Sequence, residues 1–170
     1  MPIEVYNLSS QSSSLILSQA IRARKGEGGL DLIPDGDWNE ESFEHMSIDR
    51  VYFDLGSWSG TTWKKIEFRD CEFFGGIFYN VEFIDCTFSN VLFYSISARG
   101  SRFTNSRFSD VVFSGAILND SMFDRCSIFE CKFNADMMGG VSDLTGVTFE
   151  QSPTDRIDFS SSIGYSDKYR

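Results

Sequence analysis

Large apolar residues recur at every fifth position over most of the chain, and no charged residue interrupts them. A period of five fits neither the 3.6-residue period of a helix nor the two-residue period of a strand. It predicts a chain that turns a corner every five residues. The members are Trp38, Phe43, Ile48, Phe53, Trp58, Trp63, Phe68, Phe73, Phe78, Phe83, Phe88, Phe93, Ala98, Phe103, Phe108, Phe113, Leu118, Phe123, Ile128, Phe133 and Met138.

A second, uncharged series lies two residues before the centres from Ile48 to Phe133. Its members are Met46, Val51, Gly56, Thr61, Ile66, Cys71, Gly76, Val81, Cys86, Val91, Ile96, Ser101, Ser106, Val111, Ala116, Ser121, Cys126 and Cys131. Two residues of every five therefore point inward and three point outward. Four such sides close a square coil of about 20 residues, and coils stack at the β spacing of about 4.8 Å. We expect an all-β protein, a right-handed quadrilateral parallel β-helix.

These units resemble the pentapeptide-repeat family, whose consensus is Ala, then Asp or Asn, then Leu and two variable residues. Phe replaces the consensus Leu in the units 66–68, 71–73, 81–83, 86–88 and 131–133, whereas Ala135, Asp136 and Met137 come closest to the consensus text. The resemblance covers roughly residues 38–160 and implies a stacked β-helix. The Phe-rich composition is similar to that of the members that interact with DNA gyrase and confer quinolone resistance.

The ends of a coil stack need cover. Ser12–Ser14, the apolar stripe from Leu15 to Ile21, a basic last turn and Gly26 predict a short helix that caps the first coil. We therefore divide the chain into a segment 1–35 with the capping helix, a β-helix 36–160 and a tail 161–170. The last coil is frayed, covered by this tail, or covered by a second subunit. The family resemblance implies a homodimer through the C-terminal ends.

The five-residue series shifts once, near Gly139 and Gly140. After Met138 the centres become Leu144, Phe149, Thr154 and Phe159. We interpret the shift as a tolerated one-residue insertion, with a kink or loop at the glycines. Whether this shift has a function is left open.

Charge and composition exclude several classes of function. The net charge of −10 disfavours direct binding of nucleic acid, because the protein would repel phosphates. No apolar run reaches the length of a membrane span, and Glu4 without a basic region argues against a secretory signal. We therefore expect a cytoplasmic protein.

Catalytic and metal-binding patterns are missing. The one histidine, His45, points outward by its phase in the repeat. Cys71, Cys86, Cys126 and Cys131 occupy the small inward position, without zinc-ligand spacing or disulfide geometry, and are expected to be buried free thiols. We predict no cofactor, no metal site and no enzymatic activity.

One side of the predicted coil carries apolar residues on its outer surface. The predicted partner-binding residues are Tyr52, Phe74, Leu92, Tyr94, Val112 and Tyr79, with Leu55, Ile77 and Ile117 nearby. Such a patch is typical of a contact surface for a protein partner or a second subunit. Burial by the N-terminal segment, or a plain preference of strands for these residues, explains it equally well.

Two functions of different kinds fit this sequence. The family resemblance implies a DNA mimic that binds type II topoisomerase, although the arginines Arg99, Arg102 and Arg107 break the acidic surface at mid-height. Alternatively the chain is a scaffold, or an immunity-type inhibitor of a toxin or effector. In that role the aromatic side would dock a dedicated partner, and the acidic ends would face a basic one.

Overall fold

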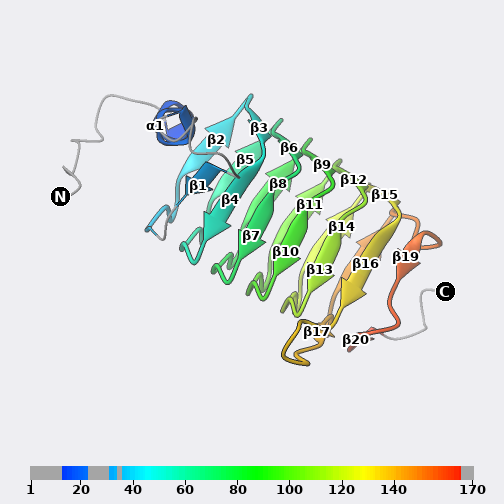
Figure 1. Ribbon diagram of the computed structural model, residues 1–170. Coiled ribbons are helices and arrows are strands. Elements are labelled where there is room, and N and C mark those ends of the chain that lie inside the picture. The colour runs from blue at the N-terminus through cyan, green and yellow to red at the C-terminus, as the bar shows by residue number, and fades with distance from the viewer. Residues whose placement is uncertain (1–12, 23–30, 34–35, 166–170) are drawn as a thin grey trace.

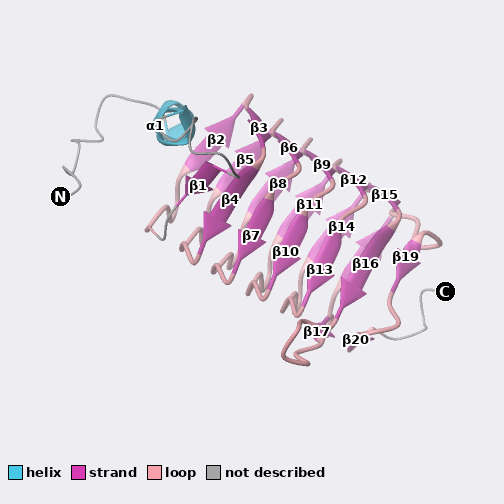
Figure 2. Ribbon diagram, viewed as in Figure 1, coloured by secondary structure: helices cyan, strands magenta, loops and turns pink. Residues whose placement is uncertain are grey.

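The computed structural model describes residues 13–22, 31–33 and 36–165. The chain winds into a stack of short parallel strands, and the helix α1 (Ser13–Arg22) lies against the N-terminal end of this stack (Figure 1). Strands and short turns alternate regularly along the described chain (Figure 2). This is the quadrilateral parallel β-helix that the five-residue period predicts.

Three parallel sheets run along the stack. The first sheet contains β1 (Asp31–Ile33), β4 (Val51–Asp54), β7 (Glu72–Phe74), β10 (Leu92–Tyr94), β13 (Val112–Ser114), β16 (Cys131–Asn134) and β19 (Ile157–Asp158). The second contains β2 (Ser42–Glu44), β5 (Thr62–Lys64), β8 (Glu82–Ile84), β11 (Arg102–Thr104), β14 (Met122–Asp124) and β18 (Thr148–Glu150). The third contains β3 (Ser47–Asp49), β6 (Glu67–Arg69), β9 (Thr87–Ser89), β12 (Arg107–Ser109) and β15 (Ser127–Phe129).

The fourth side, which we call the bridge side, is held by single β-bridges. They join Asp37, Ser57, Ile77, Ser97, Ile117 and Asp143 in succession. At the C-terminal end the short strands β17 (Ser142–Asp143) and β20 (Ser162–Ile163) form a separate pair. The four sides together close each coil.

The large centres form ladders of stacked rings inside the coil. Phe73, Phe93 and Phe113 are paired in register, and the ring centroids of each neighbouring pair lie 4.8 Å apart. Phe83 and Phe103, from the adjoining side, are buried in the same core. A stacked aromatic pair adds about 0.5–1.5 kcal/mol beyond the burial of its area, so the ladders stabilise every interface between coils.

Small polar residues in the second series are satisfied within the stack. The Ser101 hydroxyl is fully buried, donates to the carbonyl of Phe78 at 2.6 Å and accepts from the amide of Val81 at 3.2 Å. Buried hydroxyls without partners would destabilise the core. Serine can therefore replace Val or Cys in this series, because the neighbouring coil supplies a donor and an acceptor.

The corners of the coil use left-handed backbone conformation. Every fifth residue from Glu40 to Glu130 has a positive φ, and this residue is a non-glycine at most corners. Asn and Asp tolerate this region better than most residues, and they occupy corners such as Asp70, Asn80 and Asn90. The regular corner explains the absence of slippage over this range.

The predicted N-terminal helix is confirmed. Leu17 of α1 is fully buried in the hydrophobic core, and the helix contacts β1 and β2. Two serines near its start join it to the first coil: Ser13 Oγ donates to a carboxylate oxygen of Glu41, and the amide of Glu44 donates to Ser14 Oγ at 2.7 Å. The basic last turn and Gly26 lie outside the described residues except for Arg22.

The interpretation of the shift near Gly140 as a one-residue insertion is wrong. Ser97 bridges to Ile117, 20 residues on, whereas Ile117 bridges to Asp143, 26 residues on. Six residues are therefore added to this coil, and the chain leaves the lattice after β16. Met138 is not an inward centre, since 93% of its surface is exposed. Leu144 resumes the interior and is fully buried.

The C-terminal end is covered in part by the following segment. The Tyr165 ring stacks on Phe159 at 4.0 Å and meets Phe149 edge-on at 6.0 Å. The pairing of β20 with β17 brings this segment back to the coil. Of the three arrangements expected for the last layer, the residues up to Tyr165 adopt the one in which the chain covers itself. The domain boundaries at 35 and 160 remain predictions, although β1 already pairs with β4 before residue 36.

Candidate protein-binding surface

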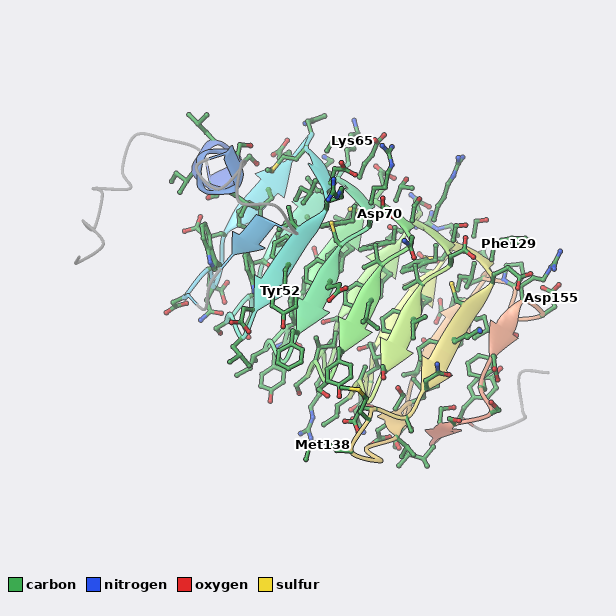
Figure 3. The ribbon with its side chains drawn as sticks, in the orientation of Figure 1. Tyr52, Lys65, Asp70, Phe129, Met138 and Asp155 are labelled. Carbon is green, nitrogen blue, oxygen red and sulfur yellow. The ribbon has the colours of Figure 1, made fainter. Side chains whose placement is uncertain are left out.

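The outer face of the first sheet carries a ladder of aromatic side chains. The rings of Tyr52 and Phe74 lie 5.9 Å apart, and those of Phe74 and Tyr94 lie 5.2 Å apart and nearly parallel, at 3°. Leu92 and Val112 are neighbours in register on the same face. We call these five residues, Tyr52, Phe74, Leu92, Tyr94 and Val112, the aromatic wall. Figure 3 shows Tyr52 on this face.

The stacking decides what the wall offers to a ligand. The two faces of Phe74 are taken by Tyr52 and Tyr94, so ring edges rather than ring faces are presented outward. A cation needs the face of a ring, and the wall therefore does not form a cation cage. Ring edges and aliphatic side chains fit an apolar surface.

The acidic residues near Tyr52 alter its ionisation. Partial burial raises the pKa of the Tyr52 hydroxyl, and the carboxylates of Asp54 and Glu72 raise that pKa further. The phenol thus stays protonated at neutral pH and can donate a hydrogen bond. The same two carboxylates place negative charge at the N-terminal end of the wall.

Three more exposed apolar residues lie beside the wall. Leu55 is 56% exposed at the corner after β4, and Ile77 and Tyr79 are exposed on the bridge side. The Leu55 side chain lies over Gly75 in the next coil, where a Cβ would come within 2.5 Å of Leu55 Cδ2. Gly75 therefore provides the space that keeps Leu55 on this corner.

The structure brings most of the predicted site residues together. Tyr52, Phe74, Leu92, Tyr94 and Val112 share one face and are half-buried, whereas Tyr79 lies around the corner and is exposed. Their role in binding remains a prediction. None of them is covered by the described residues of the N-terminal segment, because α1 lies at the end of the stack (Figure 1).

Sequence reasoning missed the most exposed apolar residues of the described chain. Residues 135–141, which we call the methionine loop, present Met137 and Met138 with 92% and 93% of their surfaces exposed. Met138 is labelled where this loop projects from the stack in Figure 3. In the sequence, only the two adjacent glycines after the two methionines indicate an exposed loop. Met138 obscures this indication, because it is apolar and falls on the five-residue series of inward centres.

Asp136 gives the methionine loop a defined shape. Its Oδ1 accepts hydrogen bonds from the amides of Met138 at 2.9 Å and Gly140 at 2.7 Å, and Oδ2 accepts one from Ser95 Oγ at 3.1 Å. The Gly140 amide contributes most to holding the pKa of Asp136 below its usual range. The loop is thereby fixed to the coil beneath it.

The loop also adjoins the aromatic wall. The amide of Met137 donates to the hydroxyl oxygen of Tyr94 at 3.4 Å, and Ser114 Oγ donates to the carbonyl of Ala135 at 3.1 Å. These contacts join the loop to strands β10 and β13. Wall and loop therefore form one surface.

A shallow groove of about 470 Å³ follows the corner between the third and first sheets. Asp70, labelled in Figure 3, accepts a hydrogen bond from Asn90 Nδ2 at 2.7 Å there. Arg50, Glu72 and Asp110 add mixed charge, and Leu92 and Val112 line the side next to the aromatic wall. The groove is thus a polar border of the wall.

The structure confirms that His45 points outward and that the four cysteines point inward. His45 is exposed at a corner, where its Nδ1 lies 3.5 Å from a carboxylate oxygen of Glu44. All four cysteines are buried and free. Burial raises the pKa of each thiol to about 11, so these thiols are protonated and poorly nucleophilic at neutral pH.

Within residues 13–22, 31–33 and 36–165, no three His, Cys, Asp or Glu side chains are grouped to hold a metal ion. No helix in these ranges is both long and apolar enough to cross a membrane.

Comparison with known proteins identifies a repeat region in the chain. Residues 76–159 match the model of the pentapeptide repeat region. The same five-residue lattice continues through the preceding coils. Among curated proteins, none matches this chain.

Several solved structures are similar at low identity. QnrB1, a plasmid-mediated fluoroquinolone resistance protein, has 13% identity and a TM-score of 0.33 over 75% of this chain, which spans 66% of that chain. Rfr23, a pentapeptide repeat protein from the cyanobacterium Cyanothece 51142, has 10% identity and a TM-score of 0.38. The similarity covers 86% of this chain and 98% of Rfr23. HetL, a pentapeptide repeat protein involved in heterocyst differentiation regulation in Nostoc sp. strain PCC 7120, has 9% identity and a TM-score of 0.29. The similarity covers 89% of this chain and 86% of HetL. Similarity at this level says nothing about the partner of this chain.

Proposed function

We propose that this chain is a non-enzymatic binding protein whose aromatic wall and methionine loop contact a protein partner. One observation carries the proposal: a stacked aromatic ladder is joined, through the Tyr94 hydroxyl, to a loop that holds Met137 and Met138 in solvent. Large contiguous exposed apolar surfaces usually mark contact sites. Aromatic residues and methionine are enriched in such interfaces.

The partner would be held by side chains rather than by added strands. Strands β4, β7, β10, β13 and β16 have a neighbour on both sides in the first sheet, so their backbone groups are already paired. A partner on this wall thus gains affinity from buried apolar area, with anchors at the rings and at the loop tip.

Substitution of the wall tests this proposal. Phe74→Asp combined with Tyr94→Asp is expected to abolish recovery of the native partner in an affinity pull-down, because two desolvated charges would enter the interface. Thr104→Asp, on the second sheet, is the matched control and should leave recovery unchanged. Circular dichroism verifies that each variant is folded. Equal recovery by the folded double variant would exclude this surface.

A second candidate is a DNA mimic that binds type II topoisomerase. The net charge of −10 on a rod favours it, because a continuous acidic surface imitates the phosphates of a duplex. Lys64 and Arg102 on the second sheet, and Lys65 at the corner after β5, interrupt that continuity. A gyrase supercoiling assay with and without ciprofloxacin tests this candidate. No change in supercoiling or drug sensitivity at micromolar protein would remove it.

A third candidate is an immunity-type inhibitor of a basic toxin or effector. Glu40, Glu41 and Glu44 concentrate acidity at the N-terminal end, as Glu150, Asp155 and Asp158 do at the other end. Stoichiometric inhibition by a 1:1 complex would support it, whereas a bound partner with full activity would favour a scaffold. For either role we propose a reducing cytoplasm, which suits four free thiols.

A further inference from the structure

Exposed and half-buried apolar side chains form a row parallel to the axis of the stack. Leu55 follows β4, Phe74 lies on β7, Tyr94 lies on β10, and Met137 and Met138 project from the loop that follows β16. We call these five residues the apolar row. At about 4.8 Å per coil, the distance from β4 to β16 is about 19 Å, which is the length of a helix of about 13 residues.

The spacing within the row fits a helix better than a strand. Successive apolar side chains on one face of a helix recur with its pitch of about 5.4 Å, close to the rise of one coil. A strand binds by joining a free sheet edge. The row offers no such edge, because the strands from β4 to β16 in the first sheet are paired on both sides. Helix-in-groove recognition through apolar anchors is therefore the mode that this surface allows.

Negative charge lies at both ends of the row, and Lys132 on β16 adds one positive charge to the outer face of the same sheet. Asp54 and Glu72 lie at the Tyr52 end, and Asp136 lies within the methionine loop. On the bridge side, hydrogen bonds from Thr145 and Asn119, and then the charge of Arg99, hold the pKa of Asp143 below its usual range. If a second copy docked by a two-fold contact, it would place these carboxylates opposite one another, which is unfavourable. The charges favour a partner with Lys or Arg beside its apolar face.

We propose that the apolar row binds a basic amphipathic helix of about three to four turns on a protein partner. The inference rests on the proposed function as a protein-binding module. Leu55 and the two methionines bracket the helix, and Phe74 and Tyr94 contact its apolar stripe. The fixed shape of the methionine loop lowers the entropy that must be lost on binding.

Two fluorescent model peptides of about 14 residues test this proposal with the full-length chain. They share the same Leu positions, and the polar face carries Lys in one peptide and Glu in the other. Fluorescence anisotropy should give at least about tenfold tighter binding of the Leu/Lys peptide. Met137→Ser with Met138→Ser should weaken that binding by about tenfold, since it removes apolar contact without changing charge.

Phe129→Ser is the matched control, because Phe129 is an exposed apolar residue on the third sheet. Loss of binding in the methionine variant alone supports the proposal. Equal binding of both peptides, no binding of either, or equal effects of the two substitutions would overturn it. Light scattering at the same protein concentration detects a dimer, and a dimer that the methionine variant dissociates would place a second copy on the row and also overturn it.

The outcome is separable from that of the proposed function. If Phe74→Asp with Tyr94→Asp abolishes recovery of the native partner but neither peptide binds, the protein-binding role stands and the helix is excluded. If the native partner is recovered equally by that variant, the proposed function itself fails.

Discussion

At the residue scale, the inward residues of the bridge side are paired by size, each centre with the residue two positions earlier. Gly76 precedes Phe78, and a Cβ on Gly76 would approach Phe78 Cε2 to 2.7 Å. Gly56 is similarly close to Trp58. In the next coil the order of sizes reverses, with Ile96 before Ala98, both buried. On this side of the coil a large centre therefore accompanies a small partner, and a small centre accompanies a larger one.

Gly76→Ala is expected to lower the free energy of unfolding by about 1–3 kcal/mol, because overpacking forces Phe78 from its position. Urea denaturation measures the change. Cys86→Ala is a suitable control for a small substitution in the same series. Gly76→Ile combined with Phe78→Ala, which copies the Ile96 and Ala98 pair, should be more stable than Gly76→Ile alone. If Gly76→Ala is as stable as the parent, the packing argument is wrong.

The buried thiols make stability depend on alkaline pH. Burial raises each cysteine pKa from 9.0 to about 11. Between these values the unfolded chain releases protons that the folded chain retains, so stability is constant below pH 9 and falls as pH rises toward 11. The slope approaches about 1.4 kcal/mol per pH unit for each thiol.

Replacing all four cysteines with serine isolates this effect. Serine already occupies the equivalent inward position at Ser101, Ser106 and Ser121, so the variant should fold. Urea midpoints between pH 8 and 11 should fall less steeply for the variant than for the parent. Parallel curves would assign the pH dependence to lysine and tyrosine instead.

At the scale of elements, the methionine loop depends on one carboxylate. Asp136→Ala removes the acceptor for the amides of Met138 and Gly140, and we expect hydrogen exchange at these amides to become several-fold faster. The core strands β10 and β13 should keep their protection. Slow exchange at Gly140 in the variant would show that other contacts fix the loop.

The same loop has a pH dependence of opposite direction. Hydrogen bonding holds the Asp136 pKa below its usual 3.8, so the ordered loop is favoured above about pH 4 and loses this support as pH falls through the lowered pKa. Hydrogen exchange at the Gly140 amide, corrected for its intrinsic pH dependence, should therefore become faster as Asp136 is protonated.

The capping helix is the second element with a measurable contribution. Leu17→Ala should lower the free energy of unfolding by about 2–4 kcal/mol, because Leu17 is fully buried against the first coil. Leu15→Ala, at a position 42% exposed, should change it by less than about 1 kcal/mol. Thermal denaturation followed by circular dichroism compares the two. Equal effects would indicate that α1 does not cap the stack.

At the scale of the whole molecule, the sequence predicted the coil because one physical constraint repeats in every turn. Each inward centre from Phe43 to Phe133 was placed correctly, and the aromatic wall followed from the phase of the repeat. The strand β1 was missed because the uncharged series begins only at Met46, and counting back by five from there gives Glu41, Gly36 and Asp31.

A kink or loop at Gly139 and Gly140 was expected, but the length of the methionine loop and the exposure of Met138 were missed for a different reason. Met138 is apolar and falls on the five-residue series, so the sequence pattern alone assigns it to the interior even though it is exposed. The strand register of the next coil reveals the six added residues, since Ile117 bridges to Asp143 and Phe123 pairs with Phe149. Candidate binding residues on the lattice are thus accessible from the sequence, whereas those on an insertion require the coil register.

The left-handed corner gives the fold a means of acquiring new surfaces. The regular series of positive φ values ends at Glu130, and the chain departs at Ala135, the next corner, then re-enters at Ser142. Two ring ladders continue past the loop, from Phe123 to Phe149 and from Phe133 to Phe159. A projecting segment can therefore be transplanted to another corner, such as that at Asn105, without rethreading the interior. Evolution or design would then be able to change which partner the protein binds without changing its buried core.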